Sequence, residues 1–195
     1  MKLPLLPLNA IVCPQGRIPL QIFEPHYLDM IADSMKQGEG FVAVLMCSEN
    51  APTEHVREGQ FYELGTRVQI VDFGKTPSTG VLNLTVEGLE QVKLSSLEER
   101  ENGVWYAELE AIGEEQHIDL PEEFDELRVV LQALVKHPFV RDLNMDIDYE
   151  DGRQVGWRLT ELLPLGNKQK QHLYEMSDPL QRLQAISRQI SDMVT

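Results

Sequence analysis

The chain has 195 residues, a net charge of −15 and an apolar fraction of 42%. This length and apolar content are typical of a globular protein that buries its core in one large domain or two small ones. The acidic surplus disfavours binding to phosphate backbones. No run approaches the roughly 18 apolar residues of a membrane span, and the start does not have the basic and apolar regions of a signal peptide. We therefore expect a cytoplasmic protein.

Prolines interrupt the apolar start of the chain. Proline fixes φ and lacks a backbone N–H, so it suits strand ends, sheet edges and first helical turns. The sequence thus predicts short extended pieces that end at Pro4, Pro7, Pro14 and Pro19. A helix is predicted to begin at Pro25 and to end near Gly38. Its apolar residues have the spacing of an amphipathic helix: Tyr27, Leu28, Ile31 and Met35.

From residue 40 to residue 112 apolar and polar residues alternate, as they do in half-buried strands. FVAVLMC predicts a fully buried strand, and TRVQIVDF predicts a strand with one apolar face. In VLNLTVEGLEQVKL we expect Gly88 to form a bulge or kink. After the turn-like Asn102-Gly103 the alternation resumes at Trp105. These short strands indicate an antiparallel barrel or sandwich rather than a βαβ repeat.

The apolar period becomes helical near residue 119. Asp119 and Glu122 have the spacing of a capping box, and the helix that they predict ends at Pro138. Further helices are predicted over 155–163, from Asn167 onward and from Asp178 to the end. The fold class is therefore α+β, with a β domain that contains one helix over 1–117 and a helical bundle over 118–195.

Motifs for catalysis or metal binding do not stand out. None of the five histidines takes part in an HxxxH or HExxH motif, and no GxSxG elbow occurs. The acidic segment DLNMDIDYEDG, 142–152, resembles a calcium loop, but an EF-hand counted from Asp142 requires glycine where Ile147 stands. We expect a solvated loop there, with weak calcium binding as the alternative. Otherwise we expect no catalytic residue, no metal and no cofactor.

Four blocks carry a family resemblance: PLNAIVCPQGRIPLQIFEPHYLDMI, LGTRVQIVDF, GVLNLTVEGLEQVKL and LPLGNKQKQHLYEMSDPLQRL. In this order they resemble the amino-terminal domain of ATP-dependent Lon proteases over nearly the whole chain. The resemblance implies a PUA-like β pseudobarrel followed by a helical bundle. Gln15 stands where the family usually has glycine, so the turn there is expected to differ. No GxxxxGK[ST] phosphate loop occurs, so we expect a stand-alone recognition module that is not an enzyme.

The resemblance also implies a function. The module would bind unfolded or tagged polypeptides, in partnership with a protease or chaperone. The candidate binding residues lie in the matched blocks: Arg17, Phe23, Glu24, Tyr27, Arg67 and Phe73. The main alternative is RNA binding, because PUA-like folds often bind RNA, although the net charge disfavours it. A third alternative is an enzyme whose site is assembled from residues that the sequence does not pair.

Overall fold

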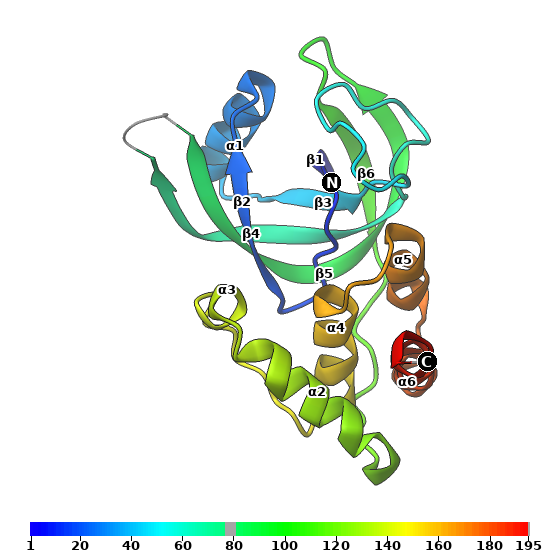
Figure 1. The fold of residues 1–195 in the computed structure, drawn as a ribbon. Coiled ribbons are helices and arrows are strands. Elements are labelled where there is room, and N and C mark those ends of the chain that lie inside the picture. Colours follow the sequence, from blue (N-terminus) through cyan, green and yellow to red (C-terminus); the bar gives the residue numbers. More distant parts are fainter. Residues whose placement is uncertain (77–80, 195) are drawn as a thin grey trace. The chain divides into compact units, whose positions relative to one another are not determined.

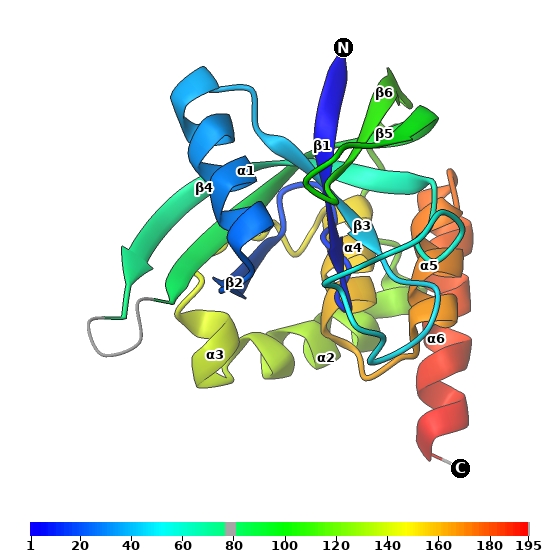
Figure 2. The same ribbon diagram turned by 90° about the horizontal axis from the view of Figure 1, so that it is seen from above.

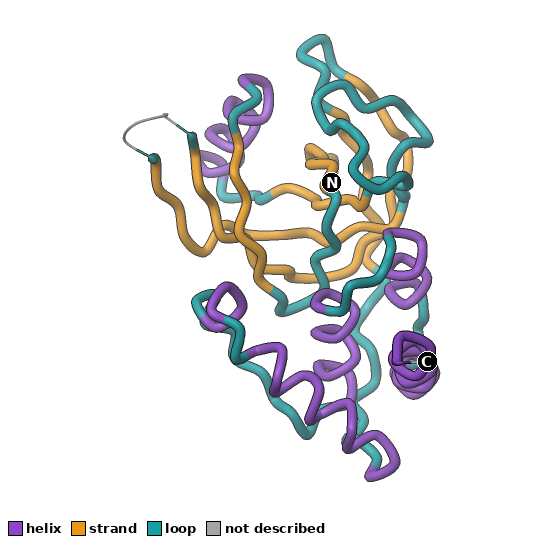
Figure 3. The backbone as a smooth tube through the Cα atoms, viewed as in Figure 1, coloured by secondary structure: helices purple, strands orange, loops and turns teal. Residues whose placement is uncertain are grey.

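The computed structural model describes residues 1–76 and 81–194. By its internal contacts the chain divides into two compact units, Met1–Gly113 and Glu114–Thr195 (Figure 1). The described strands all lie in the first unit, whose described residues also form one helix, and the described elements of the second unit are helices (Figure 3). The α+β class expected from the change in apolar period is thereby confirmed.

A mixed sheet of six strands forms the first unit. The strands are β1 (Lys2–Leu8), β2 (Arg17–Ile22), β3 (Phe41–Leu45), β4 (Leu64–Lys75), β5 (Leu82–Glu99) and β6 (Trp105–Ala111). Their order is β2-β5-β4-β3-β1-β6, and β6 pairs again with β5. This second pairing closes β5, β4, β3, β1 and β6 into a barrel, while β2 pairs with the first part of β5. The expected barrel-like architecture is therefore present, but the expectation that all strands pair antiparallel is wrong, because β1 and β3 pair in parallel.

Helix α1 (Pro25–Gln37) packs on one face of this sheet (Figure 2). Pro25 occupies the start of the helix, where its missing N–H costs no helical hydrogen bond. Gly38 ends the helix with a left-handed φ of 71°, and its N–H donates to the carbonyl of Ser34. Met30 and Ile31 join a core cluster with residues of β1 to β5. Both predicted ends of this helix are confirmed.

The prediction that prolines end the first strands is wrong for β1 and β2. Pro4 and Pro7 lie inside β1, and Pro19 lies inside β2. β1 pairs with β6 only over residues 2–4 and with β3 only over residues 5–8. Each half of β1 thus pairs on one side, and a proline nitrogen that faces the other side removes no ladder hydrogen bond. β2 is an edge strand, which also tolerates proline.

Gly88 marks a close approach between β5 and the turn before β2. The β4–β5 register shifts between Arg67 and Val68, next to Gly88, so the expected irregularity is confirmed. A Cβ at Gly88 would lie 2.2 Å from the carbonyl oxygen of Cys13, a distance that only glycine avoids. The Gly88 carbonyl accepts from the Gln15 N–H at 2.8 Å. Gln15 itself has a φ of 62°, the left-handed conformation in which glycine is favoured.

The second unit is a cluster of helices around one apolar core. The helices are η1 (Glu122–Phe124), α2 (Asp125–Val135), α3 (Pro138–Arg141), α4 (Gly152–Leu162), α5 (Asn167–Glu175) and α6 (Pro179–Val194). The predicted cap at Asp119 is wrong, because Asp119 pairs in an isolated β-bridge with Asp151 and the helical turn begins only after Pro121.

Within the described residues no helix is long and apolar enough to cross a membrane.

Candidate functional site

An apolar groove lies between helix α1 and the end of the β4–β5 hairpin. Its volume is about 380 Å³. The residues that line it are Leu28, Ile31, Ala32, Met35, Phe73, Gly74, Lys75 and Leu82. The helical residues among them repeat at intervals of three and four, so they form one stripe on α1. The groove therefore combines an apolar helix face with an apolar strand end, and Lys75 is the charged residue of its lining.

Phe73 owes its direction to a bulge in β4. Ile70 pairs with Val86 and Phe73 pairs with Leu84, so Val71 is the additional residue between the two paired positions. Directly paired residues point to the same face of a sheet. Leu84 and Val86 belong to the core beneath α1, so the bulge turns Phe73 toward the α1 side. There 61% of its surface is exposed, which is unusual for so large an apolar side chain.

Two other candidate residues, Phe23 and Glu24, lie between β2 and α1. Phe23 is 60% exposed and directly follows Ile22, whose strand partner Leu82 lines the groove. Glu24 precedes the first turn of α1, where a negative charge is favourable. Phe23 and Phe73 thus give this end of the sheet two exposed aromatic side chains.

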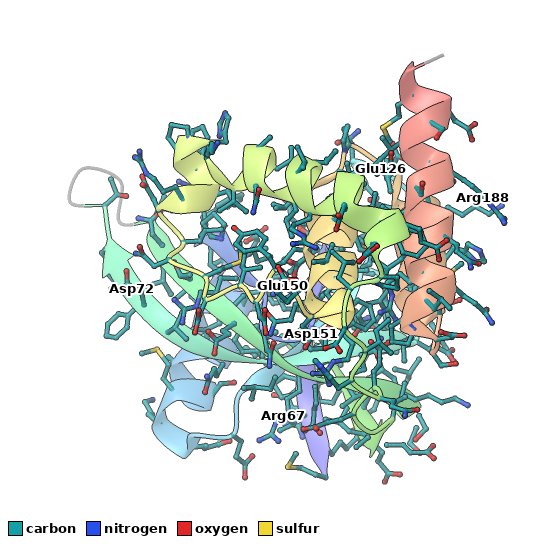
Figure 4. All side chains as sticks on the ribbon, turned by 90° about the horizontal axis from the view of Figure 1, so that it is seen from below. Arg67, Asp72, Glu126, Glu150, Asp151 and Arg188 are labelled. Carbon is teal, nitrogen blue, oxygen red and sulfur yellow. The ribbon has the colours of Figure 1, made fainter. Side chains whose placement is uncertain are left out.

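The two candidate arginines form ion pairs on the sheet. The Nε of Arg17 donates to Glu87 at 2.6 Å, and an Nη of Arg67 donates to Glu90 at 3.2 Å. Both guanidinium groups are partly buried. Arg67 and Asp72 both come from β4 and are labelled in Figure 4. Because each arginine is neutralised by a glutamate, the pairs do not form a basic surface.

Tyr27 is buried, with 2% of its surface exposed, and belongs to the core beneath α1. Its hydroxyl donates to the carbonyl of Thr53 at 3.0 Å. Burial and, to a lesser extent, the charge of Glu24 raise the pKa of the Tyr27 hydroxyl far above its ordinary value. Tyr27 therefore holds the loop that contains Thr53 against α1, and any part that it takes in binding is indirect.

Of the six candidate residues named from the sequence, Phe73 lines the groove, and the other described lining residues were not among them. The sequence shows Leu28, Ile31 and Met35 as part of the apolar stripe of an amphipathic helix, but it does not identify them as candidate binding residues. In the structure Ile31 is fully buried while Met35 is 41% exposed, so the stripe is wider than the core that it covers. An apolar helix face that extends beyond its core is the signal that the sequence contained.

The acidic loop before α4 has a structural role at two of its carboxylates. Asp148 accepts from the N–H of Glu150 at 2.9 Å, and Asp151 accepts from the N–H of Arg153 at 2.9 Å. Glu150 and Asp151 are labelled in Figure 4. Burial by itself raises the pKa of the Asp151 carboxyl, but hydrogen bonds and charge from Arg153, together with the charge of His117, outweigh it and lower that pKa. Asp151 thus caps α4 as an ionised group.

Comparison with known proteins agrees with this architecture. The family described as the ATP-dependent protease La (LON) substrate-binding domain matches residues 2–192. A crystal structure of a Lon N-terminal domain protein from Xanthomonas campestris is similar over 96% of this chain and 98% of its own, with 29% identity and a TM-score of 0.76. The N-terminal domain of the Mycobacterium avium complex Lon protease shares the fold over 98% of this chain and 99% of its own, with 16% identity and a TM-score of 0.59. No curated protein matches the sequence of this chain. The chain belongs to the family of the Lon substrate-binding domain.

Proposed function

We propose that the chain is a non-catalytic module that binds unfolded or tagged polypeptides in the groove between α1 and the β4–β5 hairpin. The observation that carries this proposal is Phe73, an aromatic side chain that is 61% exposed beside an apolar groove of about 380 Å³. Exposed apolar surface of this kind marks interaction sites on proteins that are otherwise soluble. Membership of a family of substrate-binding domains supports a protein as the ligand.

The groove is suited to weak and general recognition. It is large enough for one or two apolar side chains, and burial of each contributes about 1.5–3 kcal/mol before the cost of ordering the bound chain. Such a small interface favours a dissociation constant on the order of micromolar. Micromolar affinity allows a bound polypeptide to be released to a protease or chaperone, which we propose as the partner.

RNA binding is the less favoured function. Affinity for RNA comes largely from basic side chains that displace counterions from phosphates. Arg17 and Arg67, the candidate basic residues, are paired with Glu87 and Glu90, and the chain has a net charge of −15.

A titration at two salt concentrations separates the two functions. A fluorescently labelled, reduced and unfolded protein and a single-stranded RNA are each titrated with the chain at about 50 and 200 mM salt. We expect binding of the unfolded protein to persist at the higher salt concentration, because apolar burial does not depend on counterion release. Binding of RNA that is lost at the higher salt concentration, without any binding of the unfolded protein, would replace the proposed function with its alternative.

A further inference from the structure

Among the described residues, no strand is paired with one edge of the last part of β4. β3 pairs with β4 only at three positions, the last of which joins Phe41 to Val68. Beyond Val68, β4 continues to Lys75 and pairs with β5 alone. Within residues 1–76 and 81–194, no strand lies on the other side of this segment. Residues 71–75 are all exposed, so the edge is accessible.

The hydrogen-bond pattern of the hairpin determines which backbone groups face this edge. The N–H of Thr76 donates to the carbonyl of Val81 at 3.0 Å, which makes these two residues a hydrogen-bonded pair. In an antiparallel ladder hydrogen-bonded and non-hydrogen-bonded pairs alternate. The next pairs along the hairpin are Lys75 with Leu82, Gly74 with Asn83 and Phe73 with Leu84. The N–H and C=O groups of Phe73 and Lys75 therefore point away from β5, toward the unpaired edge.

The side chains of the same two residues face the groove. Phe73 pairs with Leu84 and Lys75 pairs with Leu82, and these two leucines pack in or against the core beneath α1. Phe73 and Lys75 both line the groove. A strand added at this edge would pair with Phe73 and Lys75, and its residues opposite them would point to the same face. Every second side chain of such a strand would thus lie on the side of the sheet where the apolar groove is.

We propose that the edge of β4 over residues 72–75 binds an extended segment of an unfolded polypeptide as an additional strand of the sheet. The proposal rests on the proposed function and specifies how its ligand binds. The bound segment has apolar residues at alternate positions, and charge complementarity favours an acidic residue opposite Lys75. Backbone hydrogen bonds supply affinity that does not depend on sequence, while the groove selects the alternating apolar side chains.

Several features favour a foreign segment over a second copy of the chain at this edge. The bulge at Val71 limits the regular edge to a few residues, which is how native sheets restrict pairing between copies. Two copies that met at their β4 edges would bring two Lys75 side chains together. Each copy also carries a net charge of −15, which opposes association.

Amide hydrogen exchange tests the proposal on the full chain. The probe is a peptide of about six residues, a usual strand length, acetylated and amidated, in which leucine alternates with serine and one leucine is replaced by aspartate. We expect saturating peptide to slow exchange of the Phe73 and Lys75 amides. The Asp72 and Gly74 amides, which already donate within the hairpin, are expected to change little.

The other outcomes separate the two proposals. Binding of the peptide without protection of Phe73 and Lys75 would overturn strand addition and leave the proposed function intact. Absence of binding by both the peptide and an unfolded protein would overturn both. Protection of the two amides in the free chain, with a sedimentation coefficient that rises with concentration, would assign the edge to self-association and overturn the proposal.

A pair of variants gives an independent readout. Lys75→Pro removes an outward N–H that takes no part in the β4–β5 ladder, whereas Lys75→Ala removes the same charge and keeps the N–H. We expect Lys75→Pro to bind the peptide about tenfold more weakly than Lys75→Ala, the effect of one lost hydrogen bond. Equal affinities of two folded variants would contradict strand addition.

Discussion

Phe73 is an aromatic residue among those that line the groove, and large aromatic side chains often contribute most of the free energy at a binding site. We expect Phe73→Ala to weaken binding of unfolded protein by about 1–2 kcal/mol, which is roughly five- to thirtyfold. Because the side chain is 61% exposed, stability should change by less than about 0.5 kcal/mol.

Phe139 is the matched control for Phe73. It is 80% exposed but belongs to α3 in the second unit, which does not line the groove. Phe139→Ala should leave the affinity unchanged in the same fluorescence titration. An equal loss of affinity in both variants would indicate general stickiness of exposed aromatic residues rather than a site at the groove.

Gln15 occupies a backbone conformation that suits glycine. Its φ of 62° costs a residue with a Cβ about 1 kcal/mol, part of which is offset because glycine loses more entropy on folding. We expect Gln15→Gly to raise the free energy of unfolding by up to about 0.5–1 kcal/mol, measured by urea denaturation. Gln15→Ala, which keeps the Cβ, should not be stabilised, and a stabilisation equal to that of Gln15→Gly would contradict this explanation.

At the scale of elements, Asp151 links the acidic loop to α4 by both a cap and an ion pair. Asp151→Asn keeps a capping side chain but removes the charge that pairs with Arg153 at 2.7 Å. At neutral pH we expect this variant to be less stable than the wild type by about 1–2 kcal/mol. Denaturant unfolding measures the difference.

The same variant has a defined dependence on pH. The pKa of Asp151 is lowered in the folded state, so its contribution is complete above the ordinary value of 3.8 and is lost as the pH falls through the lowered value. The stability difference between wild type and Asp151→Asn should therefore shrink as the pH falls from about 5 to 2. A difference that stays constant over this range would show that charge is not the cause.

The sequence predicted well those helices and strands whose ends and burial are determined by residues within or next to them. The ends of α1 are set by Pro25 and Gly38, and the fully buried β3 is visible as an uninterrupted apolar run. Pro4 and Pro7 were wrongly predicted to end strands. β1 accommodates them because each of its halves pairs with a neighbour on one side only, and that pairing is a property of the whole sheet. Local periodicity does not contain that information.

The groove was predictable only in part for the same reason. Phe73 and the α1 stripe were visible as apolar residues in matched blocks. Their convergence depends on the bulge at Val71, which reverses the alternation of β4 so that Ile70 and Phe73 share a face. Lys75 and Leu82 join the groove through the hairpin register, which the sequence pattern does not determine.

At the scale of the whole molecule, the division into two domains stays a prediction, and Glu115 provides a way to test it. Arg182 is fully buried, and its Nη1 donates to the Glu115 carboxylate at 2.9 Å. The domain boundary expected from the sequence, after residue 117, would separate this pair. Loss of one partner of a buried ion pair costs about 3–5 kcal/mol.

Two fragments of the chain differ in whether they retain this pair. A fragment of residues 118–195 lacks Glu115, and it also lacks His117, which lies 3.2 Å from Asp119 and 3.3 Å from Asp151. We expect a fragment of residues 114–195 to unfold cooperatively, and a fragment of residues 118–195 to be less stable by several kcal/mol or unfolded. Circular dichroism during thermal unfolding measures both. Equal stability of the two fragments would contradict the role of Glu115, and failure of both to fold would contradict an independent second domain.

The binding site itself can be located in the full chain by nuclear magnetic resonance. Amide chemical shifts are recorded while a reduced, unfolded protein is added, and shift changes are mapped on the sequence. If the groove binds unfolded polypeptides, the changes should cluster on α1 between Leu28 and Met35 and on the end of the β4–β5 hairpin near Phe73. Binding accompanied by changes confined to residues 114–195, or spread evenly over the chain, would contradict a binding site in the groove.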